Sequence, residues 1–115
     1  MNFKKPTVQL LGRFQPFHDG HLALFEEALK KTGQVCIMVR DTGGIDKKNP
    51  FNFEYVKKEI ENKLLPKYKD KFVILLVPNI TNISYGRDVG YSIEEIDLPE
   101  DIKNISATKI RNNMK

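Results

Sequence analysis

The order of short apolar segments constrains the fold of this chain most, because strand-like and helix-like periods alternate along it. The predicted elements are, in chain order, a strand at 7–11, a helix at 20–31, a strand at 34–40, a helix from Pro50 to just before Pro66, and a strand at 72–77. Gly33 is placed to end the first helix. The last two strands are nearly continuous apolar runs, typical of a parallel sheet covered on both faces. The pattern predicts an α/β fold with a small Rossmann-like, doubly wound parallel sheet.

The region after the third predicted strand is a loop rich in Asn, Ser and Gly. It leads to a predicted short strand at 91–98 and then to a closing helix at 107–114 with Ser106 as its N-cap. No repeat or break in composition divides the 115 residues. We therefore expect a single domain that spans 1–115.

Composition excludes several classes of protein. Hydrophobic residues make up 40% of the chain, which indicates a folded globular protein, yet its apolar runs are too short to cross a bilayer. The N-terminus has no apolar stretch of the secretory type, so we expect a cytoplasmic protein with no membrane partner. The single Cys36 cannot form an internal disulfide and reads as a small buried hydrophobe. A net charge of +4 permits anionic ligands, but without aromatic residues interleaved on an exposed sheet we predict no nucleic-acid partner.

The connection between the first strand and the first helix, residues 12–21, is the most informative stretch. In a fold of this class it lies at the carboxyl end of the strand, where the free N–H groups of the following helix favour an anion such as phosphate. Gly12 permits close approach of a backbone, and Gly20 permits a tight turn into the helix. His18 and His21, three positions apart, can direct ring N–H groups toward one anionic point.

Structural explanations compete with this functional one. Histidines often serve only in packing, Phe14 and Phe17 are typical core residues, and Asp19 could simply cap the helix. We favour function, because a histidine pair around a glycine at a strand-to-helix turn has little structural purpose. Zinc would require a third ligand, and no convincing one lies nearby, so no protein metal site is predicted.

A second cluster lies at 105–111. Ser106 as N-cap would form another anion site at a helix start, to which Thr108 adds a hydroxyl and Lys109 and Arg111 add cations. The alternative is an ordinary capped amphipathic tail. If the cluster is functional, two helix starts face one polyphosphate.

Both clusters carry a family resemblance. Residues 12–21 resemble the G-x-F-x-P-x-H-x-G-H signature of the HxGH nucleotidyltransferase superfamily, which has a cytidylyltransferase-like domain, and 105–111 resemble its I-S-x-T-x-x-R motif. The variant at 13–17 is most similar to archaeal-type nicotinamide-mononucleotide adenylyltransferases. The compact length and the Lys47-Lys48 pair are more similar to glycerol-3-phosphate cytidylyltransferases. The chain departs from these relatives in its short acceptor region at 84–91, and Ala107 stands where Gly is frequent.

The resemblance implies a nucleotidyltransferase-type fold and transfer of a nucleotidyl group, AMP favoured, from a nucleoside triphosphate with Mg²⁺ to a phosphorylated acceptor such as nicotinamide mononucleotide. His18 and His21 would be catalytic. Nucleotide-binding residues would be Gly12, Arg13, Phe14, Gly20, Ser106, Thr108 and Arg111. Weaker candidates for the acceptor side are Arg40, Lys47, Lys48, Asn82 and Arg87.

Three other readings stay open. One is CTP-dependent cytidylyl transfer to a polyol phosphate such as glycerol 3-phosphate, and another is a non-catalytic nucleotide-binding module. A degenerate aminoacyl-tRNA synthetase core is disfavoured, because the chain has no tRNA-binding extension. A homo-oligomer could complete the acceptor pocket across a two-fold interface.

Overall fold

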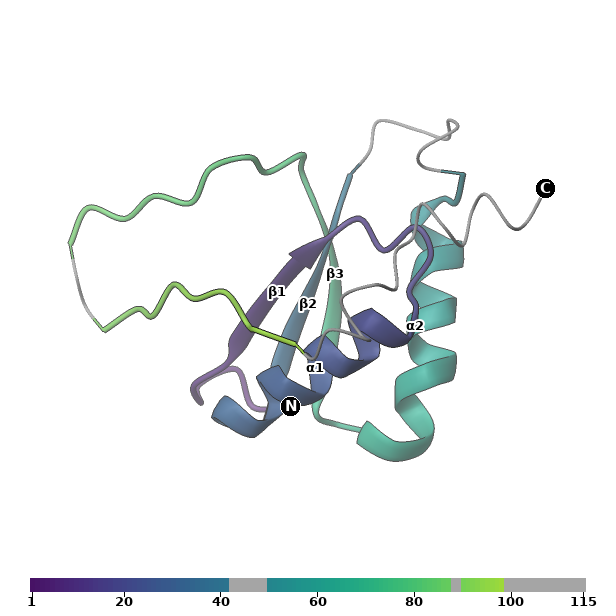
Figure 1. The fold of residues 1–115 in the computed structure, drawn as a ribbon, viewed down its shortest axis with the longest axis horizontal. Helices are drawn as coiled ribbons and strands as arrows, with labels where there is room; N and C mark the ends of the chain where they lie inside the picture. The colour runs from purple at the N-terminus through teal and green to yellow at the C-terminus, as the bar shows by residue number, and fades with distance from the viewer. Residues whose placement is uncertain (42–49, 88–89, 99–115) are drawn as a thin grey trace.

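The computed structural model describes residues 1–41, 50–87 and 90–98. Its elements are, in order, β1 (Val8–Gly12), α1 (Asp19–Thr32), β2 (Val35–Arg40), α2 (Phe53–Tyr68) and β3 (Phe72–Val77). The strands form a parallel sheet in the order β1-β2-β3, as Figure 1 shows. The predicted α/β class with a Rossmann-like parallel sheet is confirmed, and β3 has the predicted bounds.

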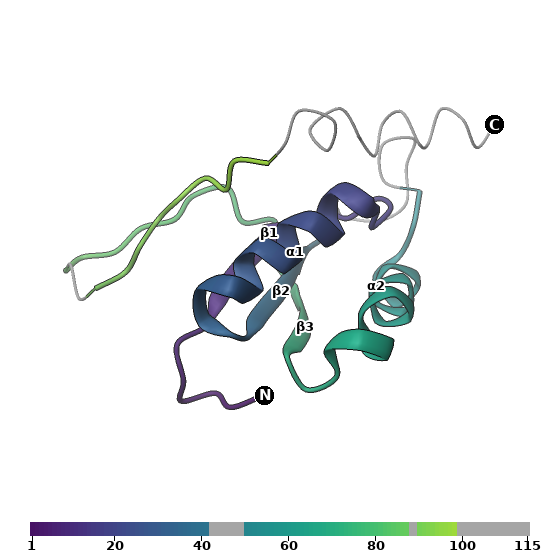
Figure 2. The ribbon, with the colours of Figure 1, turned by 60° about the horizontal axis from the view of Figure 1, so that its bottom comes forward.

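The core lies on one face of this sheet. α1 lies across β1 and β2, and α2 lies beside β3 (Figure 2). Along β2, Val35, Ile37 and Val39 are buried in the same cluster as the apolar residues of both helices, whereas Cys36 and Met38 alternate with them and are only partly buried. Among the described residues both helices therefore pack on the same face of the sheet. We expected helices on both faces, and within these residues the second face carries none.

α1 forms because it has an apolar stripe along one side and a capping residue at each end. Phe25 and Ala28 are fully buried against the sheet. Gly33 follows the last turn in the left-handed region, with φ of 83°, and its N–H donates to the carbonyl of Leu29 at 2.8 Å. Lys30 and Lys31 in the last turn suit the negative end of the helix dipole. The predicted end at Gly33 is confirmed.

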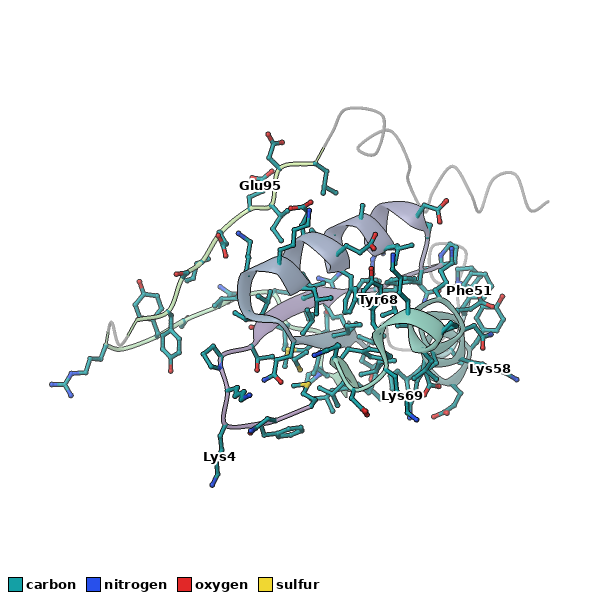
Figure 3. The ribbon with its side chains drawn as sticks, turned by 90° about the horizontal axis from the view of Figure 1, so that it is seen from below. Lys4, Phe51, Lys58, Tyr68, Lys69 and Glu95 are labelled. Carbon is teal, nitrogen blue, oxygen red and sulfur yellow. The ribbon has the colours of Figure 1, made fainter. Side chains whose placement is uncertain are left out.

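α2 differs at both ends from its sequence prediction. It begins at Phe53, with Asn52 rather than Pro50 at its start, because the Asn52 side chain accepts a hydrogen bond from the Tyr55 N–H. It also continues through Pro66 to Tyr68. The Tyr68 ring packs on Phe25 of α1, with 5.2 Å between ring centroids, and its hydroxyl donates to Glu26. These contacts hold the last turn in place despite the proline, and Figure 3 shows Tyr68 between the two helices.

Residues 78–87 leave the sheet on the side away from α2, and residues 90–98 return toward α1 (Figure 1). The predicted strand at 91–98 is wrong, because these residues form no sheet pairing. Residues 90–98 are held near α1 by an ion pair of 3.1 Å between Lys31 and Glu94 and by Ile96, which packs against the core. The predicted helix at 107–114 lies outside the described residues.

No helix within the described ranges is both long and apolar enough to cross a membrane. The cytoplasmic location stays a prediction.

Candidate functional site

The connection between β1 and α1 begins at the carboxyl edge of the sheet, where Gly12 pairs with Val39 of β2. Its second residue after the strand, Phe14, has a positive φ of 52° and turns its ring back over Gly12. A Cβ at position 12 would lie 3.1 Å from Cζ of that ring. The close approach that Gly12 permits is therefore to Phe14, a contact within the protein.

An aromatic cage surrounds the second histidine. Phe14 and Phe17 are 4% and 3% exposed and belong to the core, so the Phe14 ring is held inside the protein. The His21 ring lies 4.9 Å from the Phe14 ring and 5.5 Å from the Phe17 ring. The His18 ring stacks on it at 3.8 Å, with 23° between the planes. The two imidazoles therefore form one rigid pair.

The same histidines start α1. His18 is the N-cap, and its Nδ1 accepts a hydrogen bond from the Gly20 N–H at 3.0 Å. Nδ1 of His21 accepts in return from the His18 N–H at 3.2 Å. This reciprocal cap corrects the suggestion that Asp19 caps the helix, and it places Gly20 inside the first turn of α1, where it is buried.

The caps fix the position of the ring protons. A neutral imidazole that accepts at Nδ1 carries its proton on Nε2. Burial of the ring, together with a smaller contribution from the adjacent His18, lowers the pKa of His21 to about 3. Burial also lowers the pKa of His18, although the carboxylate of Asp19 opposes this. At neutral pH both rings are therefore uncharged, and each carries one Nε2–H that has no hydrogen-bond partner within residues 1–41, 50–87 and 90–98.

A buried glutamine joins this loop to α2. The Gln15 amide donates from Nε2 to the Phe51 carbonyl at 2.9 Å and accepts at Oε1 from the Phe51 N–H, also at 2.9 Å. The Gln15 side chain thus satisfies the backbone N–H and carbonyl of Phe51, as a neighbouring backbone would. Sequence reasoning gave Gln15 no role, and only its place within the motif could have drawn attention to it.

Lys63 of α2 lies beside the start of α1. Its Nζ is 3.2 Å from Oδ1 of Asp19, the residue that follows the His18 cap. Its charge adds, after burial, to the lowering of the His18 pKa. No local signal in the sequence connects Lys63 with a residue 44 positions earlier.

Other predicted site residues are more dispersed. Arg13 is partly buried in the same loop as the histidines, and Arg40 ends β2 at the same edge of the sheet as Gly12. Asn82 and Arg87 are exposed, on the segment after β3 that extends away from α2 (Figure 1). The remaining candidates lie outside the described residues: Lys47, Lys48, Ser106, Thr108 and Arg111.

The part of the chain that the structure describes has no group of three His, Cys, Asp or Glu side chains placed to hold a metal ion. Asp19 is the carboxylate adjacent to the histidines in sequence, and it is paired with Lys63.

Comparisons with known proteins agree with this geometry. The family model described as cytidylyltransferase-like matches residues 10–75, from β1 to β3. Two crystal structures of a bifunctional NMN adenylyltransferase/ADP ribose pyrophosphatase from Francisella tularensis are similar, one of them complexed with AMP and a manganese ion. The identities are 34% and 32%, and the TM-scores are 0.55 and 0.54.

Each of these matches covers 64% of this chain and only 22% of the neighbour, so the matched part of this chain spans about a fifth of the length of those proteins. No curated protein sequence matches significantly. Because the matched region spans β1 to β3 and contains the histidine turn, the chain belongs to the cytidylyltransferase-like family of the HxGH nucleotidyltransferase superfamily.

Proposed function

We propose that this chain is a nucleotidyltransferase that transfers AMP from ATP to a phosphorylated small molecule such as nicotinamide mononucleotide and releases pyrophosphate. The observation that carries this proposal is the stacked pair of His18 and His21, in which both Nδ1 atoms are engaged and neither Nε2–H has a hydrogen-bond partner among the described residues. Family membership supports the reaction class, and a neighbour named as an NMN adenylyltransferase supports the substrates. In this proposal residues 1–115 form one nucleotidyltransferase domain.

The chemistry requires positioning and charge stabilisation more than a nucleophile. A phosphate monoester is already anionic near pH 7. One of its oxygens forms a bond to the α-phosphorus of the triphosphate as the bond from that phosphorus to the pyrophosphate oxygen breaks, and pyrophosphate leaves with the electron pair. A preorganised donor that meets the developing charge contributes roughly 3 to 4 kcal/mol to lowering the barrier.

The histidines supply such donors. His18 and His21 are neutral at pH 7, so each acts by donating a hydrogen bond from Nε2 to the α-phosphoryl or bridging oxygen, without transferring a proton. Fixed caps and stacked rings mean that little reorganisation accompanies the reaction. Arg13 of the same loop, with Ser106, Thr108 and Arg111, is proposed to hold the β- and γ-phosphates.

Mg²⁺ enters in this proposal with the triphosphate, as part of the substrate complex. When bound it offsets the charge of the phosphates. The manganese ion in the AMP complex of a neighbour is consistent with a divalent cation beside the nucleotide.

A pyrophosphate-release screen tests the proposal. ATP and CTP would each be offered, with Mg²⁺, to the full chain together with nicotinamide mononucleotide, glycerol 3-phosphate, ribitol 5-phosphate, phosphopantetheine or flavin mononucleotide. We expect acceptor-dependent release with ATP and nicotinamide mononucleotide. Nucleotide binding without release from any pair would contradict the proposal and favour a non-catalytic module.

The second candidate is cytidylyl transfer from CTP to a polyol phosphate, which the description of the matching family favours. The same screen separates the two, because this candidate requires release with CTP and glycerol 3-phosphate or ribitol 5-phosphate. Completion of the acceptor side by a second copy of the chain stays a prediction, as do the acceptor roles of Arg40, Lys47, Lys48, Asn82 and Arg87.

A further inference from the structure

The turn that carries the two histidines also carries a carboxylate. Asp19 is the first residue of α1, adjacent to the His18 cap, and its side chain is 74% exposed. An uncompensated negative charge at this place would repel a polyphosphate that approaches the same helix start. The proposed site therefore requires a cation near Asp19.

Lys63 is that cation. Its Nζ lies 3.2 Å from Oδ1 of Asp19, although it comes from the other helix. An ammonium group has three N–H donors, and within the described residues Asp19 is its one hydrogen-bond acceptor. Two donors are thus left beside the residue that follows His18. The charge of Lys63 also contributes to the lowered pKa of His18, after burial of the ring, which agrees with a short path between the two groups.

We propose that Lys63 is a phosphate-binding residue of this site, held by Asp19 beside the start of α1 so that its ammonium contacts the polyphosphate of the triphosphate. This inference rests on the proposed function, because it assigns Lys63 to the same anion. The chemical class it recognises is an inorganic or nucleoside polyphosphate. A lysine suits this role as a mobile point charge that can bond Asp19 and a phosphate oxygen at once.

The simplest competing explanation is a surface ion pair with no ligand. Lys63 and Asp19 are 35% and 74% exposed, and pairs of this kind contribute little to stability. The two explanations differ in one respect. An ion pair alone predicts a small change in thermal stability on removing Lys63 and no change in anion affinity, whereas phosphate binding predicts a loss of affinity.

The test compares two lysines of the same helix. Lys63→Met and Lys58→Met remove the same charge from α2, but Lys58 is exposed and projects outward from α2 on the side away from α1 (Figure 3). Binding of inorganic tripolyphosphate to the full chain would be measured by calorimetry. We expect Lys63→Met to weaken it about tenfold and Lys58→Met less than about twofold. Lys63→Arg, which keeps the charge, should stay within about threefold of the wild type.

Thermal unfolding of the three variants serves as the folding control, with midpoints expected within about 5 °C of the wild type. Equal losses for Lys63→Met and Lys58→Met would overturn the inference, as would an unchanged affinity of Lys63→Met or no binding of tripolyphosphate by the wild type. Failure of the proposed function looks different. In that case the pyrophosphate-release screen is negative, while the selective loss of tripolyphosphate binding on removal of Lys63 persists.

Discussion

The two helices of this protein begin in different ways. α2 begins at an exposed asparagine, Asn52, whose Oδ1 accepts from the Tyr55 N–H at 2.9 Å. α1 begins at His18, which is only 9% exposed, and the reciprocal bond comes from a second imidazole, His21. Both arrangements satisfy N–H groups that every helix start leaves without partners. The α2 cap achieves this with a small polar side chain.

The difference indicates what the histidines do beyond capping. A cap needs a single acceptor, and each imidazole uses only Nδ1 for it. The second ring nitrogen serves no cap, yet both rings are held among aromatic groups where burial lowers their pKa. Asn52 shows that this fold can begin a helix without such an arrangement. We interpret the Nε2–H groups at α1 as the functional part of the turn.

The largest effect is expected from separating the two nitrogens of His21. His21→Asn keeps an acceptor near the Nδ1 position but removes the distal donor, whereas His21→Gln reaches the Nε2 position with an N–H but gives up the near acceptor. We expect turnover of His21→Asn to fall by about a hundredfold, measured by pyrophosphate release, because one oxyanion donor is lost. His21→Gln should retain more turnover and unfold with about 1 kcal/mol less stability than His21→Asn.

Both variants lose the ring packing against Phe14 and Phe17, so that loss is common to them and the difference between them reports chiefly where the amide group lies. Turnover of His21→Asn within a factor of about two of the wild type would remove His21 from catalysis.

A smaller effect is expected from acid. Because the pKa of His21 is lowered to about 3 in the folded protein, the unfolded chain takes up a proton below about pH 6.5 that the folded protein does not. The free energy of unfolding is therefore greatest above that pH and falls as the pH drops from about 6.5 toward 3. From pH 6.5 to 5 the loss from this histidine approaches about 2 kcal/mol, measurable by urea unfolding.

His21→Asn provides the control, because carboxylates also destabilise proteins in acid. Its unfolding free energy should fall less steeply between these pH values. Parallel pH profiles for the wild type and His21→Asn would mean that the His21 ring is not held in its neutral form by the fold.

The smallest effect is expected at the ordinary cap. Asn52→Ala removes the acceptor for the Tyr55 N–H and should cost about 1 kcal/mol of stability while leaving turnover unchanged. Urea unfolding and pyrophosphate release on the same samples would measure both. A tenfold loss of turnover would show that the start of α2 belongs to the site, and the contrast between the two helix starts would no longer hold.

Gln15 connects the two regions that this comparison separates. Its amide pairs with both backbone groups of Phe51, the residue before Asn52, so the histidine loop and the start of α2 are held together. The start of α2, although its cap is an ordinary one, therefore helps to position the histidine loop. This pairing joins residues 36 positions apart, which is beyond any local pattern in the sequence.

The sequence by itself determined the alternating elements, their parallel class and the location of the histidine turn. These depend on apolar periodicity, on Gly33 and on a motif of ten residues, all of which are local. Even so, the expected strand at 91–98 failed, because strand formation depends on a partner strand as much as on composition.

Only the tertiary structure decided which groups the histidines bond and what surrounds them. Pro66 stays within α2 because Tyr68 packs on α1, and the Phe14 ring closes over Gly12 instead of leaving that space to a ligand. Lys63 reaches Asp19 because the packing of α2 brings it there. The reason is physical: helix propensity and apolar pattern are set by near neighbours, whereas burial, pKa and ion pairing depend on residues that meet only when the chain has folded.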